Sequence, residues 1–478
     1  MPSLSQPTFF FYDLETSGID PRKQRIMQFA GQRTDMNLEP VGEPVNIMVA
    51  LSDEVLPEPY AILVTGITPQ KSRDEGYTEA EFLRIFSEQV CQPQTTTLGF
   101  NTVRFDDEFM RFTLWRNFYD AYEWQWKDGC SRWDLLDVVR MTRALRPEGI
   151  SWPVDSSGAP TNRLELLTKQ NGLLHTHAHD ALSDVLATIS VAKLIKQQQP
   201  KLFDYLLTMR GKKAVEGLVN LADPQPFVYT SGRYPKEIAH TTVAYPIAPG
   251  SRPGSVVVWD LRHDPAEWAR KSPEELKKVR FAAAEVRKAE GFVPLPAKEL
   301  VYNRCPAVAP LGVLDAAAQA RLGLSLEAVQ QNLNKLANSG LAETLDQVFA
   351  VREMPSSSDV DVALYDGFIG DTDKTHMSVV RAAEPDDLKA MKLQFNDRRL
   401  SELLVRYKGR NVPQALNEDE RAAWEAYRAK RIAADLPAFG KQLAQAGAQA
   451  KSEEQRFLLQ ELQLWAESIV PIGEEASA

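Results

Sequence analysis

Short apolar runs open the chain, and segments with helical spacing follow them. Residues 8–13, TFFFYD, form an aromatic run that ends in an acid, and 26–33 and 45–51 continue with strand-forming residues. These runs predict a small sheet. Thr78 and Glu81 form a capping box ahead of the segment FLRIFSEQV, which predicts a helix.

Three further helices are predicted in the first 200 residues. The segment 133–145 is amphipathic, 163–170 follows a loop-like stretch at 153–162, and 180–198 is a long segment with helical periodicity. Strands followed by helices predict that residues 1–200 form an α/β domain.

The pattern of residues along the chain changes after this first domain. Short β-rich runs occur at 227–229, 241–245 and 255–260, and Pro and Gly interrupt them, which predicts a small barrel or sandwich. A helix is inserted among these strands. Ser272 is its predicted N-cap, and Glu275 completes a capping box.

The last third of the chain is predicted to be helical. Residues 354–361, MPSSSDVD, are rich in Ser and indicate a linker. Beyond them, 418–434 and 452–469 show helical spacing of apolar residues. We therefore expect an α/β domain, a small β domain with a helical insertion, and an all-α domain, at 1–200, 201–353 and 362–478.

Composition and charge agree with a multidomain globular protein. The 478 residues are 44% hydrophobic and 25% charged, so the chain can bury real cores, and its length favours about three domains. The net charge of −10 argues against an indiscriminate nucleic-acid coat. It does not exclude a nucleic-acid enzyme, because a basic groove and carboxylate-bound metal ions can exist on an acidic protein.

The three cysteines, Cys91, Cys130 and Cys305, lie far apart and have no C-x-x-C spacing. A disulfide framework or a thiolate zinc site is therefore not expected, and a reducing cytoplasm fits. The first residues lack the pattern of a signal peptide, and no apolar run approaches the roughly 18 residues of a membrane span. We expect a soluble cytoplasmic protein that does not bind membranes.

Acidic residues in three separated segments are the candidates for chemistry. Asp13 and Glu15 flank Leu14, so strand alternation places both carboxylates on one face. Asp106 opens a predicted helix, where an acid alone would indicate only an N-cap. His179 precedes Asp184 by five residues. Each motif alone is weak evidence for a catalytic site.

The same histidine segment suggests two other kinds of metal site. His175, His177 and His179 alternate in an extended stretch and suggest a zinc cluster. Zinc sites usually take ligands from rigid elements, which disfavours this interpretation. The dipeptide formed by His179 and Asp180 suggests a metal-dependent phosphohydrolase, but the other spaced ligands of such a site are not apparent.

The motifs are more specific in combination. Four converging carboxylates repel one another unless cations neutralise them, and oxygen ligands favour Mg²⁺ or Mn²⁺. Two such ions about 4 Å apart serve displacement at phosphorus, and a histidine can be the base. Residues five apart differ by about 140° around a helix, so His179 and Asp184 share a site only if His179 precedes the helix.

These three motifs resemble those of the DEDDh exonucleases. Longer strings resemble bacterial exonuclease I over nearly the whole chain: VTGITPQ, NTVRFDDE, RNFYDAYEWQW, SRWDLLDVVR, ALRPEGISWP, LFDYLLTMR and ALYDGF. The resemblance implies an RNase H-like exonuclease domain, an SH3-like barrel domain and a helical carboxy-terminal domain.

The resemblance also implies a reaction. Asp13, Glu15, Asp106 and Asp184 would hold two Mg²⁺ ions, with Mn²⁺ able to replace them, and His179 would be the general base. The enzyme would degrade single-stranded DNA processively from its 3′ end, releasing 5′ mononucleotides, in DNA repair and recombination.

Further residues are expected to bind the strand. Aromatic and basic residues alternate in RFTLWRNFYDAYEWQW, about half of them for packing and the rest for bases and phosphates. Arg163 matches an arginine near the scissile phosphate, and the less favoured alternative is a surface ion pair on a helix. By family position the DNA contacts are Glu15, Arg163, Arg111, Tyr122, Trp126, Arg140, Lys212, Tyr365 and Phe368. Contacts from all three domains would enclose the strand and explain processivity.

A protein partner is implied as well, the acidic carboxy-terminal tail of single-stranded DNA-binding protein. Arg146 and Tyr205 match positions that receive it, and the enzyme is expected to be a monomer. Asp315 lies in a stretch that is more basic in related sequences, which weakens this expectation. Two rival functions remain: a DEDDh exoribonuclease or proofreading exonuclease, and a non-catalytic single-stranded DNA scaffold.

Overall fold

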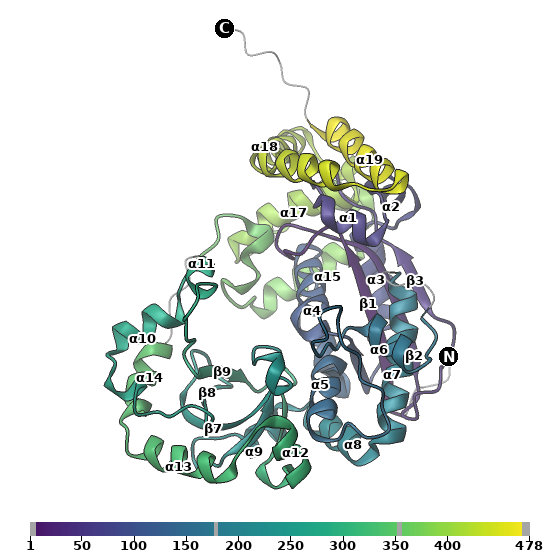
Figure 1. The fold of residues 1–478 in the computed structure, drawn as a ribbon. Helices are drawn as coiled ribbons and strands as arrows, with labels where there is room; N and C mark the ends of the chain where they lie inside the picture. The colour runs from purple at the N-terminus through teal and green to yellow at the C-terminus, as the bar shows by residue number, and fades with distance from the viewer. Residues whose placement is uncertain (1–5, 176–179, 351–355, 471–478) are drawn as a thin grey trace. The chain divides into compact units, whose positions relative to one another are not determined.

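The computed structural model describes residues 6–175, 180–350 and 356–470 (Figure 1). The chain divides into two compact units that interleave along the sequence. The first unit comprises residues 1–131, 175–186 and 355–478, and the second comprises 132–174 and 187–354.

A mixed sheet forms the centre of the first unit. Its strands are β1 (Thr8–Thr16), β2 (Ile26–Thr34), β3 (Val45–Met48) and β4 (Thr95–Gly99), in the order β3-β2-β1-β4. The pairs β1/β2 and β2/β3 are antiparallel, and β1/β4 is parallel. The order continues to β5 (Ser131–Asp134), whose first hydroxyl lies 2.9 Å from that of Thr96.

The central strand β1 is buried along almost its whole length, as expected for a strand covered on both faces. Its aromatic residues pack with Phe29 of β2 and with Phe82 and Phe86 of α3 (Glu79–Gln89). The predicted capping box of Thr78 and Glu81 starts this helix. Helices α1 (Pro59–Thr65), α2 (Pro69–Glu75) and α4 (Asp106–Arg116) complete the amino-terminal part of the unit.

Helices form the carboxy-terminal part of the first unit: α15 (Asp371–Ala382), α16 (Pro385–Ala390), α17 (Arg398–Asn411), α18 (Glu418–Gln449) and α19 (Glu453–Ile469). Helices α18 and α19 share a core with α1, in which Trp465 donates its indole N–H to the carbonyl of Val55 at 2.9 Å. Helices α15 to α17 share another core with the buried rings of Phe112, Trp115 and Phe118. The expected all-α carboxy-terminal domain is confirmed.

An antiparallel five-stranded sheet organises the second unit. Its order is β10-β6-β7-β8-β9, formed by β6 (Phe227–Thr230), β7 (Thr241–Pro249), β8 (Ser255–Asp260), β9 (Ala297–Val301) and β10 (Ala307–Pro310). Helices α10 (Pro273–Arg280) and α11 (Ala284–Arg287) lie between β8 and β9 in sequence, and the capping box of Ser272 and Glu275 starts α10. This is the predicted β domain with a helical insertion.

The remaining helices of the second unit flank this sheet in sequence. They are α5 (Leu135–Leu145), α6 (Leu164–Gln170), the later turns of α7 (Ala181–Gln198), α8 (Pro200–Thr208), α9 (Lys212–Leu218), α12 (Ala316–Leu322), α13 (Leu326–Ala337) and α14 (Leu341–Phe349). Among the residues that the structure describes, no helix is both long enough and apolar enough to cross a membrane.

Three predicted boundaries were wrong. The helix expected from residue 133 begins at Leu135, because Trp133 belongs to β5 and the Asp134 side chain caps the helix. The strand expected over 45–51 ends at Met48. The end of the expected linker is a 3-10 helix, Val360–Tyr365, in which Asp361 is 0% exposed because arginine side chains bind its carboxylate.

Candidate active site

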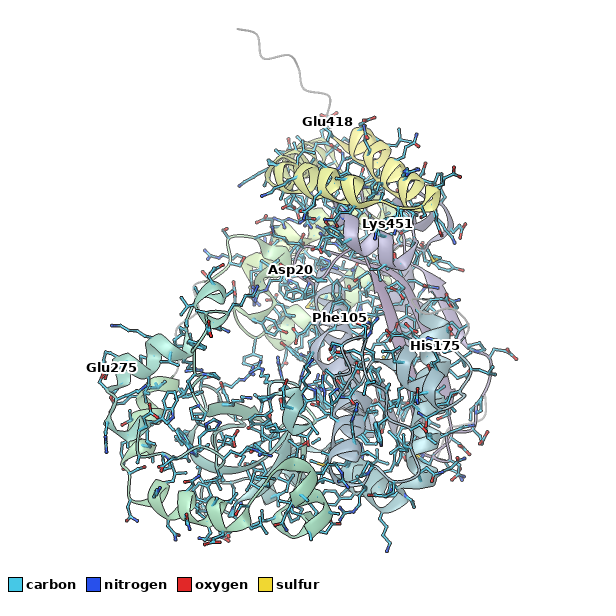
Figure 2. The ribbon with its side chains drawn as sticks, in the orientation of Figure 1. Asp20, Phe105, His175, Glu275, Glu418 and Lys451 are labelled. Atoms are coloured by element: carbon cyan, nitrogen blue, oxygen red, sulfur yellow. The ribbon has the colours of Figure 1, made fainter. Side chains whose placement is uncertain are left out.

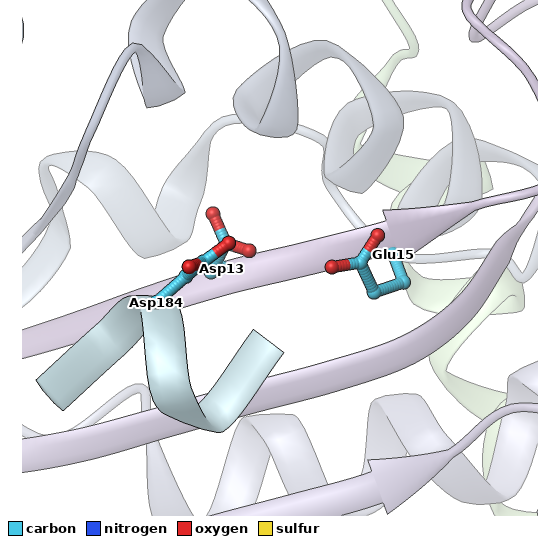
Figure 3. Close-up of side chains that lie close together, drawn as sticks. All are labelled: Asp13, Glu15 and Asp184. Carbon is cyan, nitrogen blue, oxygen red and sulfur yellow. The ribbon is translucent and has the colours of Figure 1, made fainter. Parts of the chain in front are cut away.

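Three carboxylates meet beside the central strand of the first unit. Asp13 and Glu15 lie two residues apart on β1, and Asp184 lies in the first turn of α7 (Figure 3). One carboxylate oxygen from each residue lies within 4.8 Å of the others. The alternation of side chains along a strand places the first two on one face, and the start of α7 brings the third to them.

Burial and mutual repulsion make this cluster electrostatically unfavourable without a cation. Burial is the largest cause that raises the pKa of Asp13 well above its usual range, and the charges of Asp106, Asp184 and Asp180 add to it. Burial and the charges of Asp13, Asp184 and Asp180 raise the pKa of Glu15 to about 9. A bound divalent cation would relieve both effects.

Asp106 completes the acidic environment. It is the first residue of α4, is buried, and lies close enough to raise the pKa of Asp13. The turn that leads to it passes through Asn101, which has a left-handed backbone with φ of 75°. Phe105, which is labelled in Figure 2, directly precedes the helix. The structure thus gathers all four predicted metal-binding acids in one region.

Asp180 also belongs to this region, although the sequence suggested it only as half of a dipeptide. Its Oδ2 accepts the backbone N–H of Ser183 at 3.1 Å, the pattern of a helix N-cap. Its Oδ1 accepts a hydrogen bond from Gln28 on β2 at 3.4 Å. Asp180 therefore anchors the start of α7 to the sheet and adds negative charge to the site.

The histidine expected to act as base, His179, lies outside the described residues, as does His177. Helix α7 begins at Ala181, after this position, as sharing a site with Asp184 requires. His175, labelled in Figure 2, is described, and its Nε2 lies 2.5 Å from Asp184 Oδ1. Sequence reasoning assigned His175 only to a possible zinc cluster and missed this contact.

The aromatic segment 111–126, which begins within α4 and continues beyond it, divides between core and surface, as expected. Arg111 donates to Glu108 and to Gln125, both at 2.8 Å, and its guanidinium lies over the ring of Tyr122. Trp126 is 63% exposed. Arg111 is thus a cation held in place by its contacts. Tyr122 is a partly buried ring, and Trp126 is an exposed one.

Tyr365 and Phe368, the expected DNA contacts of the last domain, lie beside an aromatic pocket of about 240 Å³. The hydroxyl of Tyr365 donates to Glu108 at 2.5 Å, and the side chain of Phe368 is fully exposed. The pocket is lined by Trp115, Tyr119, Asp120, Ala121, Tyr122, Leu364, Tyr365, Gly367, Phe368, Ile369, Lys374 and Met377.

The other expected DNA contacts belong to the second unit. Arg163 is an exposed N-cap residue of α6 that pairs with Glu165, which is the surface ion pair named above as the alternative to a phosphate contact. Arg140 pairs with Asp137 at 2.7 Å. Lys212 starts α9, and its amino group lies against Gly254 in the turn before β8.

The two residues expected to receive a protein partner are also in the second unit. Arg146 pairs with Asp315 at 3.2 Å and donates to the carbonyl of Val313 at 3.0 Å. Burial raises the pKa of Tyr205 to about 12, so its phenol stays protonated at neutral pH. Arg146 therefore already has an acidic neighbour within this chain.

The donor set suits a hard divalent cation. Asp13, Glu15 and Asp184 offer oxygen atoms at short mutual separation, and Asp106 is nearby. A mixed sheet that gathers acids at its central strand places the protein in the RNase H-like class, in which such acids hold divalent metal ions.

Comparison with known proteins gives the particular family. Three family profiles match: Exonuclease at residues 10–192, Exonuclease I SH3-like domain at 210–351, and Exonuclease I C-terminal domain at 358–469. The chain belongs to the exonuclease I family.

Relatives match over most of their length. Exodeoxyribonuclease I of Haemophilus influenzae is 39% identical, over 89% of this chain and 90% of the relative. The Escherichia coli enzyme of the same name is 39% identical over 97% and 98% of the two chains. A solved structure of E. coli exonuclease I in complex with a dA16 oligonucleotide matches with a TM-score of 0.93 at 38% identity, covering 97% of this chain and 100% of that chain.

A second solved structure gives the same result. Exonuclease I from Methylocaldum szegediense matches with a TM-score of 0.90 at 40% identity, over 97% of this chain and 100% of that chain. The RNase H-like, SH3-like and helical domains implied by the sequence are thereby confirmed.

Proposed function

We propose that this protein is a processive 3′-to-5′ exonuclease that degrades single-stranded DNA to 5′ mononucleotides. The observation that carries the proposal is the cluster of Asp13, Glu15 and Asp184 within 4.8 Å, in a chain whose relatives are exodeoxyribonucleases I. A related structure holds a single-stranded oligonucleotide, which supports this substrate.

Asp13, Glu15, Asp106 and Asp184 would hold two Mg²⁺ ions, with Mn²⁺ able to replace them. When bound, the ions would supply charge neutralisation at the phosphodiester and help to activate water. The E. coli enzyme has also been solved in a zinc-bound form with single-stranded DNA, which supports a divalent-metal site.

The protein side chains have separate tasks in the proposed reaction. The carboxylates fix the geometry of the site, with Asp13 central to it. His179, by family position, accepts the proton of the attacking water. Arg163, once released from Glu165, would place its guanidinium against the terminal phosphate.

Strand binding is proposed to combine stacking with phosphate contacts. Rings of Tyr122, Trp126, Tyr365 and Phe368 would stack bases without reading their sequence. Basic side chains would contact the backbone: Arg111, Arg140 and Lys212. Contacts from three domains would enclose the strand and slow its dissociation.

We further propose a monomer that acts in the cytoplasm, in DNA repair and recombination, with single-stranded DNA-binding protein as a partner. One related structure is described as SSB with exonuclease I and an inhibitor. Arg146 and Tyr205 would receive the acidic tail. Because Asp315 pairs with Arg146, the tail must displace or share that contact.

Digestion of end-labelled strands tests the proposed activity. Single-stranded DNA, duplex DNA and RNA are incubated side by side with and without Mg²⁺, using 3′ and 5′ labels. We expect metal-dependent release of mononucleotides from the 3′ end of single-stranded DNA. Preferential digestion of RNA would support the exoribonuclease alternative, and binding without digestion would support the scaffold.

A further inference from the structure

Glu108 joins two side chains that are distant in sequence. It lies in the first turn of α4, two residues after Asp106. Its Oε1 accepts a hydrogen bond from Arg111 at 2.8 Å, and its Oε2 accepts one from the Tyr365 hydroxyl at 2.5 Å.

One partner of Glu108, Tyr365, lines the aromatic pocket, and the other, Arg111, lies against a ring that lines it. The Arg111 guanidinium lies 5.3 Å from the centroid of the Tyr122 ring, and both Tyr122 and Tyr365 line the pocket. Tyr365 also meets Phe112 of α4 edge to face, with ring centroids 5.8 Å apart. The orientation of the Tyr365 ring is therefore fixed by one carboxylate and one ring, both carried by α4.

The contacts of Glu108 are stronger than those of an exposed ion pair. The side chain of Arg111 is 8% exposed and that of Glu108 is 17% exposed, so water screens their attraction weakly. Burial, followed by the charge of Glu108, raises the pKa of Tyr365 well above its usual range. Its phenol therefore remains a hydrogen-bond donor throughout the neutral range.

We infer that Glu108 is a positioning residue for the DNA strand: from α4, the helix that begins with the proposed metal ligand Asp106, it holds both the Tyr365 ring and the Arg111 cation. The inference rests on the proposed function. A base stacked in the pocket and the acid Asp106 at the phosphodiester would then both be positioned by α4. Glu108 itself touches no reacting atom.

Steady-state kinetics on single strands of graded length test this role. Glu108→Ala and Tyr365→Phe should each raise KM for long strands about fivefold to tenfold, with kcat within about twofold of wild type, because stacking contributes binding and not bond cleavage. Glu108→Gln keeps an oxygen acceptor and should lie between Glu108→Ala and wild type. On strands too short to reach the pocket, all three variants should match wild type.

A double variant shows whether the two residues act together. Glu108→Ala combined with Tyr365→Phe should raise KM no more than Glu108→Ala alone, because both remove the same contact. Glu425→Ala is the matched control, since Glu425 forms an i,i+3 ion pair with Arg428 on α18. It should leave KM unchanged at every length.

Three results would overturn the inference. A lower KM in Glu108→Ala would mean that Glu108 only restrains the Arg111 charge. A fall in kcat at unchanged KM would place its effect on the chemical step, and additive effects in the double variant would separate it from Tyr365. If Glu108→Ala fails to fold, Tyr365→Phe still tests the contact, and inactive wild-type protein would instead reject the proposed function.

Discussion

The hydroxyl of Tyr12 donates a hydrogen bond to Asp107 Oδ1 at 2.6 Å, and both side chains are buried. Tyr12 directly precedes Asp13 on β1, and Asp107 directly follows Asp106 on α4. This single bond therefore ties the strand that carries one candidate metal ligand to the helix that carries another. Asp106, Asp107 and Glu108 thus have different neighbours. Asp106 faces the candidate metal site, Asp107 binds Tyr12, and Glu108 binds both Arg111 and Tyr365.

We expect Tyr12→Phe to weaken divalent-metal binding about tenfold while the protein stays folded. A buried hydrogen bond to a charged group contributes about 1.5–3 kcal/mol, and its loss frees α4 to shift relative to β1. Calorimetric titration with Mn²⁺ measures the effect. Unchanged affinity would show that the backbone alone fixes the distance between Asp13 and Asp106.

Asp13→Ala or Asp184→Ala should lower hydrolysis of single-stranded DNA about a thousandfold or more. Metal ions contribute several kcal/mol to stabilisation of the transition state, and these carboxylates would hold them. DNA binding, measured by fluorescence anisotropy, should stay within a few-fold of wild type, because other residues bind the strand. Turnover close to wild type in either variant would reject the site.

His179→Ala should reduce turnover strongly and leave metal affinity unchanged, since a general base contributes about 10²–10⁴-fold to rate without ligating the ions. His175→Ala is the informative companion, because His175 contacts Asp184 at 2.5 Å. Metal titration and single-turnover assays on both variants separate the roles. Loss of metal affinity in His179→Ala would identify a ligand instead of a base.

Added Mg²⁺ or Mn²⁺ should raise the melting temperature. Burial and neighbouring acids raise the pKa of Glu15 to about 9 in the metal-free protein. A group with a raised folded-state pKa stabilises the fold at low pH and loses that contribution as pH rises toward its folded value. The gain from metal should therefore be larger at pH 8 than at pH 6.

Glu15→Gln provides the matching control for this thermal measurement. Glutamine removes the free-energy cost of keeping Glu15 protonated in the folded protein at pH 8, because its folded-state pKa of about 9 lies far above its value in the unfolded chain. The variant should therefore raise the melting temperature of the metal-free protein at pH 8 and reduce the gain from metal. A variant less stable than wild type without metal would contradict the proposed repulsion.

Local patterns in the sequence predicted the elements that depend on near neighbours. The run at 8–13 became β1, and both predicted capping boxes formed, because strand alternation and caps involve residues only a few positions apart. Asp13 and Glu15 share a face for the same reason. The approach of Asp184 to them is tertiary, and the sequence supported it only through the chemistry of converging acids and through resemblance.

Contacts between distant segments were beyond local patterns. No local pattern indicated that Glu108 meets Tyr365, which is 257 residues away. A Ser-rich segment indicated a linker, yet Asp361 in it is buried among arginines of α17 and Arg25, which lies just before β2. Whether an acid is solvated or buried depends on partners that only the folded chain supplies.

The buried ion network of the first unit should make the protein sensitive to acid. Glu54 accepts a hydrogen bond from Arg410 at 2.8 Å and lies 3.3 Å from Arg25. Burial alone would raise the pKa of Glu54 and of Asp361, but Arg410 and the other arginines hold both pKa values well below the usual range. The network thus joins the amino-terminal and carboxy-terminal segments of the unit.

A depressed carboxylate pKa stabilises the fold above the pKa of the unfolded chain and loses this contribution as pH falls toward the folded-state value. The usual values for these two groups are 4.5 and 3.8. The melting temperature should therefore be steady near neutrality and fall steeply below about pH 4.5. Thermal unfolding by circular dichroism across pH 3 to 7 measures this.

Glu54→Gln identifies the network as the cause. This variant leaves the buried positive charges of Arg25 and Arg410 with less negative charge to neutralise them. The free energy of unfolding at pH 7 should therefore fall by about 3–5 kcal/mol. Its melting temperature should also depend less on pH than that of wild type. Glu425→Gln removes an exposed ion-pair partner and should leave both quantities nearly unchanged. An equal acid response in wild type and Glu54→Gln would place the sensitivity elsewhere in the protein.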